Sequence, residues 1–321
     1  MIHPWQQHQW QVLLNAMAEG RLPHALLLSG KQGLGKLEFA KSFAHLLLCQ
    51  DPKNQTPCGK CHSCQLYDAG THPDLNLIAP EEGGSVIKVD QVREMVEKNS
   101  LTAHVSSSKI YLFVDADTLN VAASNSLLKT LEEPSPNSLL ILITSRPDLL
   151  SATIRSRCQQ LKFNLPSQQL ATEWLSKQST RADANTLLSL AQGSPLMAIK
   201  IDSEDQITLN ESVFADFGRV IFGKSDPVKV ANDWQKHDLK LIFNWLTIWV
   251  IDVIRLKYND IEPMINSTDK LRALLKIASA FTLEQLFELY DKQMQTGRLL
   301  DKQVSKALLV ESFLVSCVKN K

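Results

Sequence analysis

The chain has 321 residues, which is enough for two or three domains with a sizeable core. Its 34 lysine and arginine residues equal its 34 aspartate and glutamate residues, so the formal net charge is zero. This balance argues against a protein that holds DNA tightly by itself, and any DNA contact should be local or shared with partners.

The sequence shows neither a signal peptide nor a membrane span. Residues 1–5 lack a basic segment followed by an apolar one. The most apolar stretch, residues 241–254, contains Asn244 and Asp252 and is too short to cross a bilayer, so we expect a buried helix there. The chain is therefore predicted to be cytoplasmic, with no membrane partner. In such a protein, its six cysteines should bind metal or stay free thiols.

The first half of the chain alternates between apolar runs and helical patterns. After a helical lead-in over residues 1–24, strands are predicted at 25–28, 75–78, 109–115, 139–144 and 160–163. Helices are predicted at 37–48, 89–98 and 118–131, and residues 50–70 read as a loop. Apolar strands that alternate with helices predict a parallel sheet covered on both faces.

Strand patterns cease after Pro166. Three short helical patterns follow at 168–177, 182–191 and 195–201, and from residue 206 onward the chain reads as longer amphipathic helices. Turns are expected near 223–227, 259–263 and Gly297. Five large apolar residues on these helices should mostly form core, with about one in four facing a partner: Trp234, Phe243, Trp245, Leu246 and Trp249.

A glycine-rich loop lies between the first strand and the first long helix. Gly30, Gly33, Gly35 and Lys36 fit the spacing of a phosphate-binding loop (P-loop). The next residue is Leu37, where such loops carry a serine or threonine whose hydroxyl binds Mg²⁺. Lys36 is equally compatible with a phosphate contact and with a solvated lysine at a helix start.

A P-loop enzyme also needs an acidic group at the end of a neighbouring strand. Asp115 ends the third predicted strand and is placed to hold magnesium, but the next residue is Ala116. Asp117 lies one residue further and should point away, and Thr144 ends the fourth strand as a plausible polar sensor of phosphate. These residues predict a degenerate nucleotide site.

Four cysteines lie close together in residues 49–64. Cys49, Cys58, Cys61 and Cys64 have the spacing C-x8-C-x2-C-x2-C, which is typical of a structural Zn²⁺ site with four thiolate ligands. The alternative is a set of reduced surface thiols. His45 or His62 could replace one ligand, whereas Cys158 and Cys317 stand apart and read as ordinary thiols.

Four further segments have a recognisable pattern: 22–30, 87–93, 125–134 (which contains Leu-Glu-Glu-Pro) and 153–158 (which contains Ser-Arg-Cys). Together with the cysteine cluster, they resemble one known family over about residues 4–165. The family is that of the AAA+ clamp-loader subunits, and within it the resemblance is to the delta-prime subunits of bacterial DNA polymerase III.

The resemblance implies a domain plan and a function. It implies an AAA+ domain over 1–165 with a zinc module at 49–64, a helical lid over 166–205 and a helical collar over 206–321. Leu37, Ala116 and Leu196 each replace a group of the hydrolytic site, which resembles the non-hydrolysing member of the family. The chain should then be no enzyme on its own, with weak or absent ATP binding, within a holoenzyme whose polymerase activity lies in another subunit.

The same resemblance implies partners and one catalytic residue. Arg157 would be an arginine finger for a neighbour's ATP, with Arg155 as the alternative; without the resemblance, both read as solvated surface charges. The implied partners are the ATPase (gamma/tau) and delta subunits in a hetero-oligomeric ring, with the sliding clamp and primer-template DNA reached through the complex.

Two other functions remain open at this point. An active motor ATPase of the same family would need the hydroxyl that Leu37 lacks, and a zinc-dependent nucleic-acid-binding module is disfavoured by the neutral charge. A polar stretch at 106–109, with Lys98, could touch a DNA backbone or could simply be a polar loop before a strand.

Overall fold

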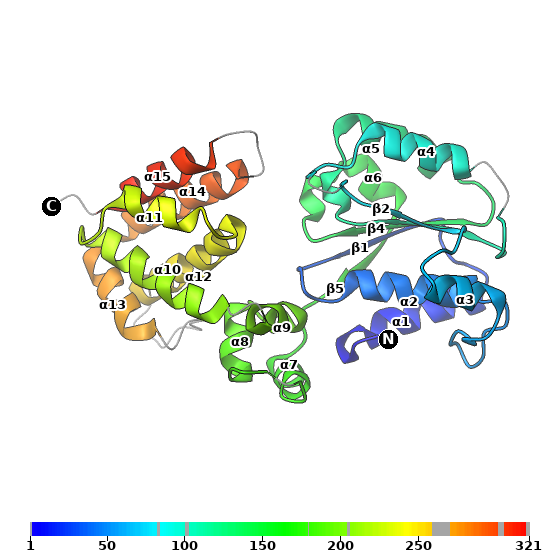
Figure 1. Ribbon diagram of the computed structural model, residues 1–321, viewed down its shortest axis with the longest axis horizontal. Coiled ribbons are helices and arrows are strands. Elements are labelled where there is room, and N and C mark those ends of the chain that lie inside the picture. The colour runs from blue at the N-terminus through cyan, green and yellow to red at the C-terminus, as the bar shows by residue number, and fades with distance from the viewer. Residues whose placement is uncertain are drawn as a thin grey trace. The chain divides into compact units, whose positions relative to one another are not determined.

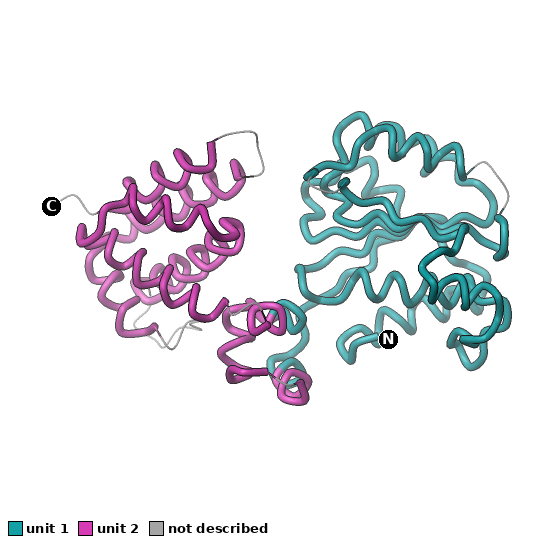
Figure 2. Tube along the Cα trace, viewed as in Figure 1, with its two compact units in different colours: residues 1–171, 194–197 teal, residues 172–193, 198–321 magenta. Residues whose placement is uncertain are grey.

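The computed structural model describes residues 2–81, 84–99, 103–178, 180–203, 206–258, 270–300 and 305–318. The chain forms two compact units, one of residues 1–171 with 194–197 and one of residues 172–193 with 198–321 (Figure 2). The division at 165/166 and 205/206 into domain, lid and collar stays a prediction. The turn expected at 259–263 lies outside the described residues.

The first unit is built on a five-stranded sheet (Figure 1). All four strand pairings are parallel, in the order β2-β3-β4-β1-β5, which confirms the predicted parallel sheet. The strands are β1 (Ala25–Gly30), β2 (Leu75–Ile78), β3 (Lys109–Phe113), β4 (Ser138–Thr144) and β5 (Gln159–Phe163). Because parallel strands share one direction, the residues that follow β1, β3 and β4 meet at one edge of the sheet.

The three central strands β3, β4 and β1 are buried on both faces because helices cover both, whereas the edge strands β2 and β5 are partly exposed. Leu27 joins the core under α4 (Val89–Asn99), α5 (Val121–Glu132) and α6 (Ala152–Arg157), whereas Leu26 and Leu28 join the core under α1 (Gln7–Ala18) and α2 (Lys36–Leu48). Figure 1 shows these two helical layers on opposite sides of the sheet. The alternation follows from the two-residue period of a strand.

Several short helices adjust the predicted boundaries. The expected loop at 50–70 contains α3 (His62–Asp68), which begins inside the cysteine cluster because the Cys61 sulfur accepts the backbone N–H of Cys64. The first helical pattern divides into η1 (Pro4–Gln6) and α1. Two further 3₁₀ turns follow β3 and β4, namely η2 (Ala116–Thr118) and η3 (Pro147–Leu149).

The described remainder of the chain is helical, which confirms an all-α part. Its helices are α7 (Gln168–Leu175), α8 (Ala184–Leu190), α9 (Pro195–Ser203), α10 (Gln206–Ile221), α11 (Pro227–Trp234), α12 (Leu239–Tyr258), α13 (Leu271–Ala280), α14 (Leu283–Leu299) and α15 (Lys306–Cys317). Gly297 lies within α14, so the turn expected there is displaced to the end of that helix at Leu299.

Helix α12 forms the centre of the second core and packs against α10, α13 and α14. Its apolar sequence is explained by this burial, as predicted for residues 241–254. The sequence predicted that most of five large apolar residues form core and that about one in four faces a partner. All five are buried within this unit: Trp234, Phe243, Trp245, Leu246 and Trp249. None of the helices in the described parts of the chain is long and apolar enough to cross a membrane.

Candidate functional site

The P-loop takes the expected position between β1 and α2. Gly33 and Gly35 have φ angles of +78° and +76°, which glycine adopts without the cost that a side chain would add. A Cβ at Gly33 would lie 2.7 Å from Met197, and a Cβ at Gly35 would lie 2.8 Å from the Gln6 amide. Both glycines are therefore needed because other parts of the same unit pack directly on the loop.

The first of these parts is the segment 194–197. The backbone N–H of Leu196 donates to the Gly33 carbonyl at 3.1 Å. Leu196 thus meets the loop through its backbone, at the position where the resemblance would place a lid arginine. The contact holds the loop against the start of α9.

The second part is the amino-terminal turn η1. The buried Gln6 side chain donates to the carbonyls of Leu34 and Gly35 at 2.8 and 2.9 Å, and the Trp5 indole donates to Leu34 at 3.0 Å. The His3 ring stacks on Trp5 with centroids 4.7 Å apart. The loop carbonyls are therefore bonded by side chains some 30 residues away in sequence, a contact that the sequence pattern did not reveal.

Lys36 is buried, with 7% of its surface exposed. Its ammonium donates to the carbonyls of Gly30 and Lys31 at 2.6 and 2.7 Å. Burial lowers its pKa to about 8, although the charges of Asp115 and Asp117 act in the opposite direction. The alternative of a solvated lysine is wrong, because the side chain folds back over its own loop.

The positions that lack polar groups are filled by apolar packing. Leu37 is partly buried against the core that contains α1 and α2, and Ala116 is fully buried. Neither side chain offers an oxygen for Mg²⁺ or for a water nucleophile. The two departures found in the sequence thus have a structural role in the core.

The acidic edge of the sheet differs from the prediction in one respect. Asp115 is exposed and has φ of +51°, and its backbone carbonyl accepts from the Thr118 N–H and hydroxyl. This left-handed residue turns the chain into η2, so Asp117 faces inward with its side chain 2% exposed. The expectation that Asp117 points away is wrong.

Asp117 forms a small polar cluster with β4. The Thr144 hydroxyl donates to Asp117 Oδ1 at 2.6 Å, and the Arg146 guanidinium donates to Oδ2 at 2.8 Å. Arg146 was not among the predicted site residues, since an arginine after a strand carries no pattern of its own. The hydroxyl of Thr144, the predicted sensor, therefore bonds Asp117, the residue that was expected to point away.

The four cysteines converge at one point. Their sulfur atoms all lie within 4.8 Å of one another, with 4.0 Å between Cys49 and Cys61 and 3.9 Å between Cys58 and Cys64. Four thiolates around one Zn²⁺ at tetrahedral geometry would be about 3.8 Å apart. His45 is not in the cluster and stacks on Tyr67 instead. The residues present fit a four-sulfur metal site.

Backbone N–H groups also point at these sulfurs. Cys58 N–H donates to Cys49 Sγ and Cys61 N–H donates to Cys58 Sγ, both at 3.3 Å. For Cys61, burial raises the pKa, but hydrogen bonds from the Gln50 and Cys64 N–H groups and from neighbouring thiols outweigh it and lower the pKa to about 6. Burial raises the pKa of Cys64 to about 12. A cation is what would bring all four sulfurs to the thiolate form.

A buried polar network joins the cysteine cluster to the sheet. Ser63 and Ser106 both donate to the Leu48 carbonyl, at 2.6 and 2.9 Å, and both lie near His72 Nε2. The Asp74 N–H donates to His72 Nδ1, which places the proton of a neutral imidazole on Nε2. His72 therefore donates to the serine hydroxyls and cannot act as their base, so the pair is structural.

Asp74 closes this network from the start of β2. Its buried carboxylate accepts the backbone N–H groups of His104, Val105 and Ser106 at 2.7 to 2.9 Å. Burial acts to raise the pKa of Asp74, but these three donors outweigh it and lower the pKa below its usual value.

Replacing Asp74 with asparagine should destabilise the protein by about 3 kcal/mol. The NH₂ group of the amide would face backbone N–H groups that now donate to the carboxylate, so buried donors would be left unpaired. Urea denaturation at pH 7 measures this loss, with the exposed Asp68→Asn as a control within about 0.5 kcal/mol. Since the folded pKa is lowered, the Asp74 contribution is present above the unfolded pKa and is lost as pH falls through the folded one. The gap between parent and variant should narrow below about pH 4. A gap of equal size at pH 3 would contradict this account.

Arg157 ends α6 beside the end of α5. Its Nη2 lies 2.7 Å from Glu132 Oε1, and its Nη1 donates to the Thr153 carbonyl at 3.2 Å. Arg155, the alternative finger, lies 3.8 Å from Asp148. Both arginines are therefore paired and only about a third exposed, rather than fully solvated. The pairing of Arg157 with Glu132 escaped the sequence analysis because no fixed spacing links them.

The polar stretch before β3 does not present a basic surface. Lys109 is buried, and its ammonium donates to the Lys98 carbonyl at 2.5 Å. Ser106 belongs to the network around His72, and the Lys98 ammonium lies 2.7 Å from Glu94. The structure thus favours the plainer of the two readings, a polar loop before a strand.

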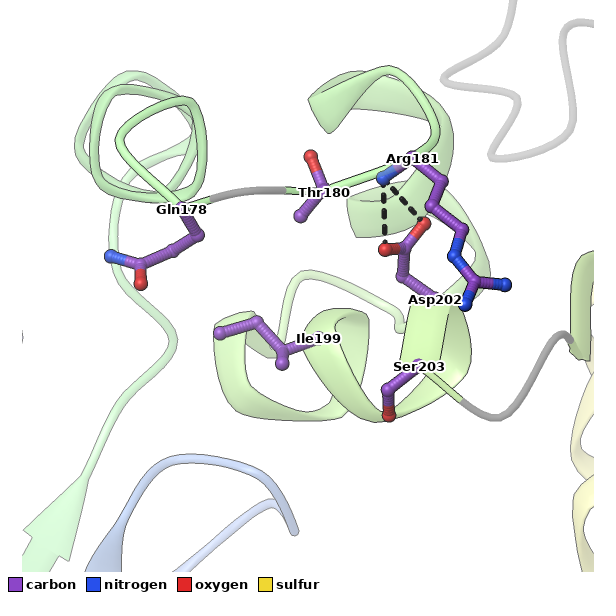
Figure 3. Close-up of a pocket in the computed structure, with 6 residues that line it drawn as sticks. All are labelled: Gln178, Thr180, Arg181, Ile199, Asp202 and Ser203. Atoms are coloured by element: carbon purple, nitrogen blue, oxygen red, sulfur yellow. Dashed lines mark hydrogen bonds between the residues drawn. The ribbon is translucent and has the colours of Figure 1, made fainter.

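A hollow of about 330 Å³ in the second unit brings together none of the predicted site residues. It is lined by Gln178, Thr180, Arg181, Ile199, Asp202 and Ser203 (Figure 3). The buried Asp202 carboxylate accepts the backbone N–H groups of Arg181 and Ala182 at 2.9 to 3.1 Å. Its role is to fasten the loop before α8 to α9.

Comparison with known proteins places the chain in a family. A family model described as "DNA polymerase III, delta subunit" matches residues 5–167, and one described as "DNA polymerase III, delta subunit, C terminal" matches residues 205–318. The chain is 33% identical to the DNA polymerase III subunit delta' of Pseudomonas aeruginosa, over 98% of this chain and 96% of that protein. It is 38% identical to the subunit delta' of Escherichia coli, over 66% of this chain and 64% of that protein.

Solved structures of low sequence identity also resemble the chain. A gamma subunit-related protein of DNA polymerase III from Thermotoga maritima has a TM-score of 0.47 and 17% identity, with coverage of 95% of this chain and 97% of that one. The DNA clamp loader delta protein of Bacillus subtilis has a TM-score of 0.35 and 12% identity, with coverage of 96% and 99%. The assignment rests on the sequence matches: this chain belongs to the family of DNA polymerase III delta' subunits.

Proposed function

We propose that this chain is a non-hydrolysing subunit of a DNA polymerase III clamp loader. It acts as a fixed element of a ring with the ATPase (gamma/tau) and delta subunits, and the ring places the sliding clamp on primer-template DNA. In this role it binds one structural Zn²⁺ through Cys49, Cys58, Cys61 and Cys64 and offers Arg157 to the ATP of a neighbouring subunit.

The state of the P-loop is the observation that carries the non-hydrolysing role. Lys36 is bonded to loop carbonyls, Gln6 and Trp5 bond the same loop from the amino terminus, and residues 194–197 pack on Gly33. Leu37 and Ala116 supply no oxygen for magnesium or water. The loop is already bonded within its own unit and lacks the groups that hold magnesium and water. Both features favour a chain that binds ATP weakly or not at all and does not hydrolyse it.

The purified chain should accordingly hydrolyse no ATP above background and should bind a fluorescent ATP analogue weakly or not at all. Steady-state phosphate release and fluorescence anisotropy measure the two properties, with a gamma/tau-type ATPase subunit as the positive control. Gln6→Ala loosens the cover of the loop without adding catalytic groups, so it should not create turnover. Turnover by the parent that disappears in Lys36→Ala would instead support the alternative of an active motor subunit.

Assembly is the direct test of the scaffold role. The chain mixed with the ATPase and delta subunits should coelute as one complex on size exclusion, with one zinc per chain by metal analysis. Removal of the helices from residue 206 onward should abolish coelution, since the resemblance assigns ring assembly to this part. Failure of the intact chain to coelute with these subunits would count against the proposal.

A further inference from the structure

The pair of Glu132 and Arg157 joins the last residues of two neighbouring helices. Helix α5 ends at Glu132 and α6 ends at Arg157. The residues beside them belong to one buried core, Leu131 on the first helix and Ile154 and Cys158 around the second. The backbones at both positions are therefore fixed by packing, and the side chains are the parts free to rearrange.

The contacts hold the guanidinium in one orientation against its own chain. Nη2 meets the Glu132 carboxylate at 2.7 Å, and Nη1 donates to the Thr153 carbonyl one turn back in α6. The side chains are 35% and 51% exposed, so the pair lies in a high-dielectric setting. Such pairs hold a side chain in place but are readily broken.

A phosphate would displace this carboxylate. Phosphate oxygens offer guanidinium the same bidentate geometry as a carboxylate, and a nucleoside triphosphate carries several negative charges where Glu132 carries one. We propose that Glu132 is a positioning residue that retains Arg157 against its own helix until a triphosphate on a neighbouring subunit replaces it. The inference rests on the proposed function of Arg157 and concerns how its engagement is regulated.

The retention makes Glu132 a brake on hydrolysis in the assembled complex, because Arg157 must leave Glu132 before it can bind the triphosphate. Glu132→Gln keeps the shape of the side chain and removes the charge, so Arg157 is released more readily. Since partly exposed ion pairs shift equilibria by small factors, we expect the DNA-independent ATPase of the assembled clamp loader to rise about two- to fivefold. The increase should shrink at high salt, because salt already weakens the parent pair.

The matched control is Glu133→Gln, which removes the same charge one residue along, at an exposed position outside the contacts of Arg157. It should leave the rate unchanged. The double variant Glu132→Gln/Arg157→Ala should behave as Arg157→Ala alone, since the brake acts only through that arginine. Glu132→Asp, with a shorter reach, provides a second variant and should give an intermediate increase.

The outcomes separate this inference from the function on which it rests. A rate that stays at the parent level or falls in Glu132→Gln, in a complex that loses activity with Arg157→Ala, would overturn the brake and leave the arginine finger standing. Unchanged activity in Arg157→Ala would remove both. Coelution of each variant with the other subunits shows that the rates compared belong to assembled complexes.

Discussion

Replacing Arg157 with alanine should lower ATP hydrolysis at the neighbouring site of the assembled clamp loader by about 10³- to 10⁵-fold, the usual effect of an arginine finger. This corresponds to about 4–7 kcal/mol of barrier. A guanidinium is always charged and presents a rigid fork of donors to the oxygens that gain charge in the transition state. Under the proposed function, that step takes place at a neighbour's site and does not use this chain's own P-loop.

The effect should be confined to hydrolysis. Arg157 is about a third exposed and its pair with Glu132 is partly solvated, so its loss should change the stability of the chain by no more than about 1 kcal/mol. Zinc content and assembly should remain. The variant thus separates a role in chemistry from a role in folding, which thermal denaturation of the isolated chain checks directly.

The measurement is a single-turnover ATPase assay on the reconstituted complex with primed DNA, because sites without Arg157 beside them would mask the loss in a steady-state average. Arg157→Lys keeps the charge but not the fork and should recover little. Arg155→Ala is the matched control, two residues away on the same helix and paired with Asp148. An unchanged single-turnover amplitude in Arg157→Ala, with a loss in Arg155→Ala, would transfer the finger to Arg155.

The sequence was sufficient for the parts of the fold that depend on local pattern. The five strands were predicted within one or two residues, most clearly where an apolar run has polar ends, as at Ser138–Thr144. All four cysteines of the cluster were predicted, because they lie within one short segment, Cys49 to Cys64, and such spacing is typical of metal ligands. The apolar stretch of α12 was predicted correctly as a buried helix. It is too short to cross a bilayer, and it contains the charged residue Asp252.

The errors concern contacts that sequence spacing does not encode. Asp117 faces Thr144 because Asp115, two residues earlier, adopts a left-handed conformation. Such a conformation is uncommon for a residue other than glycine and cannot be predicted from the sequence. Gln6 bonds the P-loop from 28 residues away. Lys36 is buried because its side chain folds back onto the carbonyls of Gly30 and Lys31, which its position at a helix start does not reveal. The absence of particular groups can be recognised in the sequence, whereas the bonds formed among the residues that remain require coordinates.

Helix α3, within the predicted loop, also depends on contacts that the sequence pattern does not show. Residues 50–70 are rich in turn formers, and α3 forms there because Cys61 caps its first turn and Ser63 and Cys64 are buried against the rest of the domain. These seven residues have little intrinsic preference for a helix. They are helical because the cap and the burial of their side chains hold the segment in place. Metal ligation would add to that fixation.

Replacing Cys64 with serine should abolish zinc binding and loosen this region. Cys64 is fully buried and contributes one of four sulfurs at ligand spacing, so its loss leaves three ligands and an unpaired hydroxyl in their place. Zinc binding is worth about 10–16 kcal/mol in isolated fingers. That value is an upper bound here, because the network of Ser63, His72 and Asp74 also holds α3 in place. We expect a loss of about 4 kcal/mol or more.

Metal analysis of purified protein and urea denaturation measure the two effects. Cys158→Ser removes a buried thiol of the sheet core and is the matched control: it should cost stability but keep one zinc per chain. Parent protein purified under reducing, zinc-replete conditions without any bound metal would contradict the prediction, as would full zinc content in Cys64→Ser.

The position of the cysteine cluster makes its loss distinguishable from that of the arginine. Helix α3 lies on the face of the sheet covered by α2, whereas α6 lies on the opposite face (Figure 1). Arg157 is the last residue of α6. Zinc removal should therefore lower the thermal stability of the chain and the yield of assembled complex. The hydrolysis rate per assembled complex should remain near that of the parent. The reverse pattern, a normal yield with slow hydrolysis, is expected of Arg157→Ala. If zinc removal instead slowed hydrolysis in fully assembled complexes, the two faces would be coupled through the sheet, and the zinc would have more than a structural role.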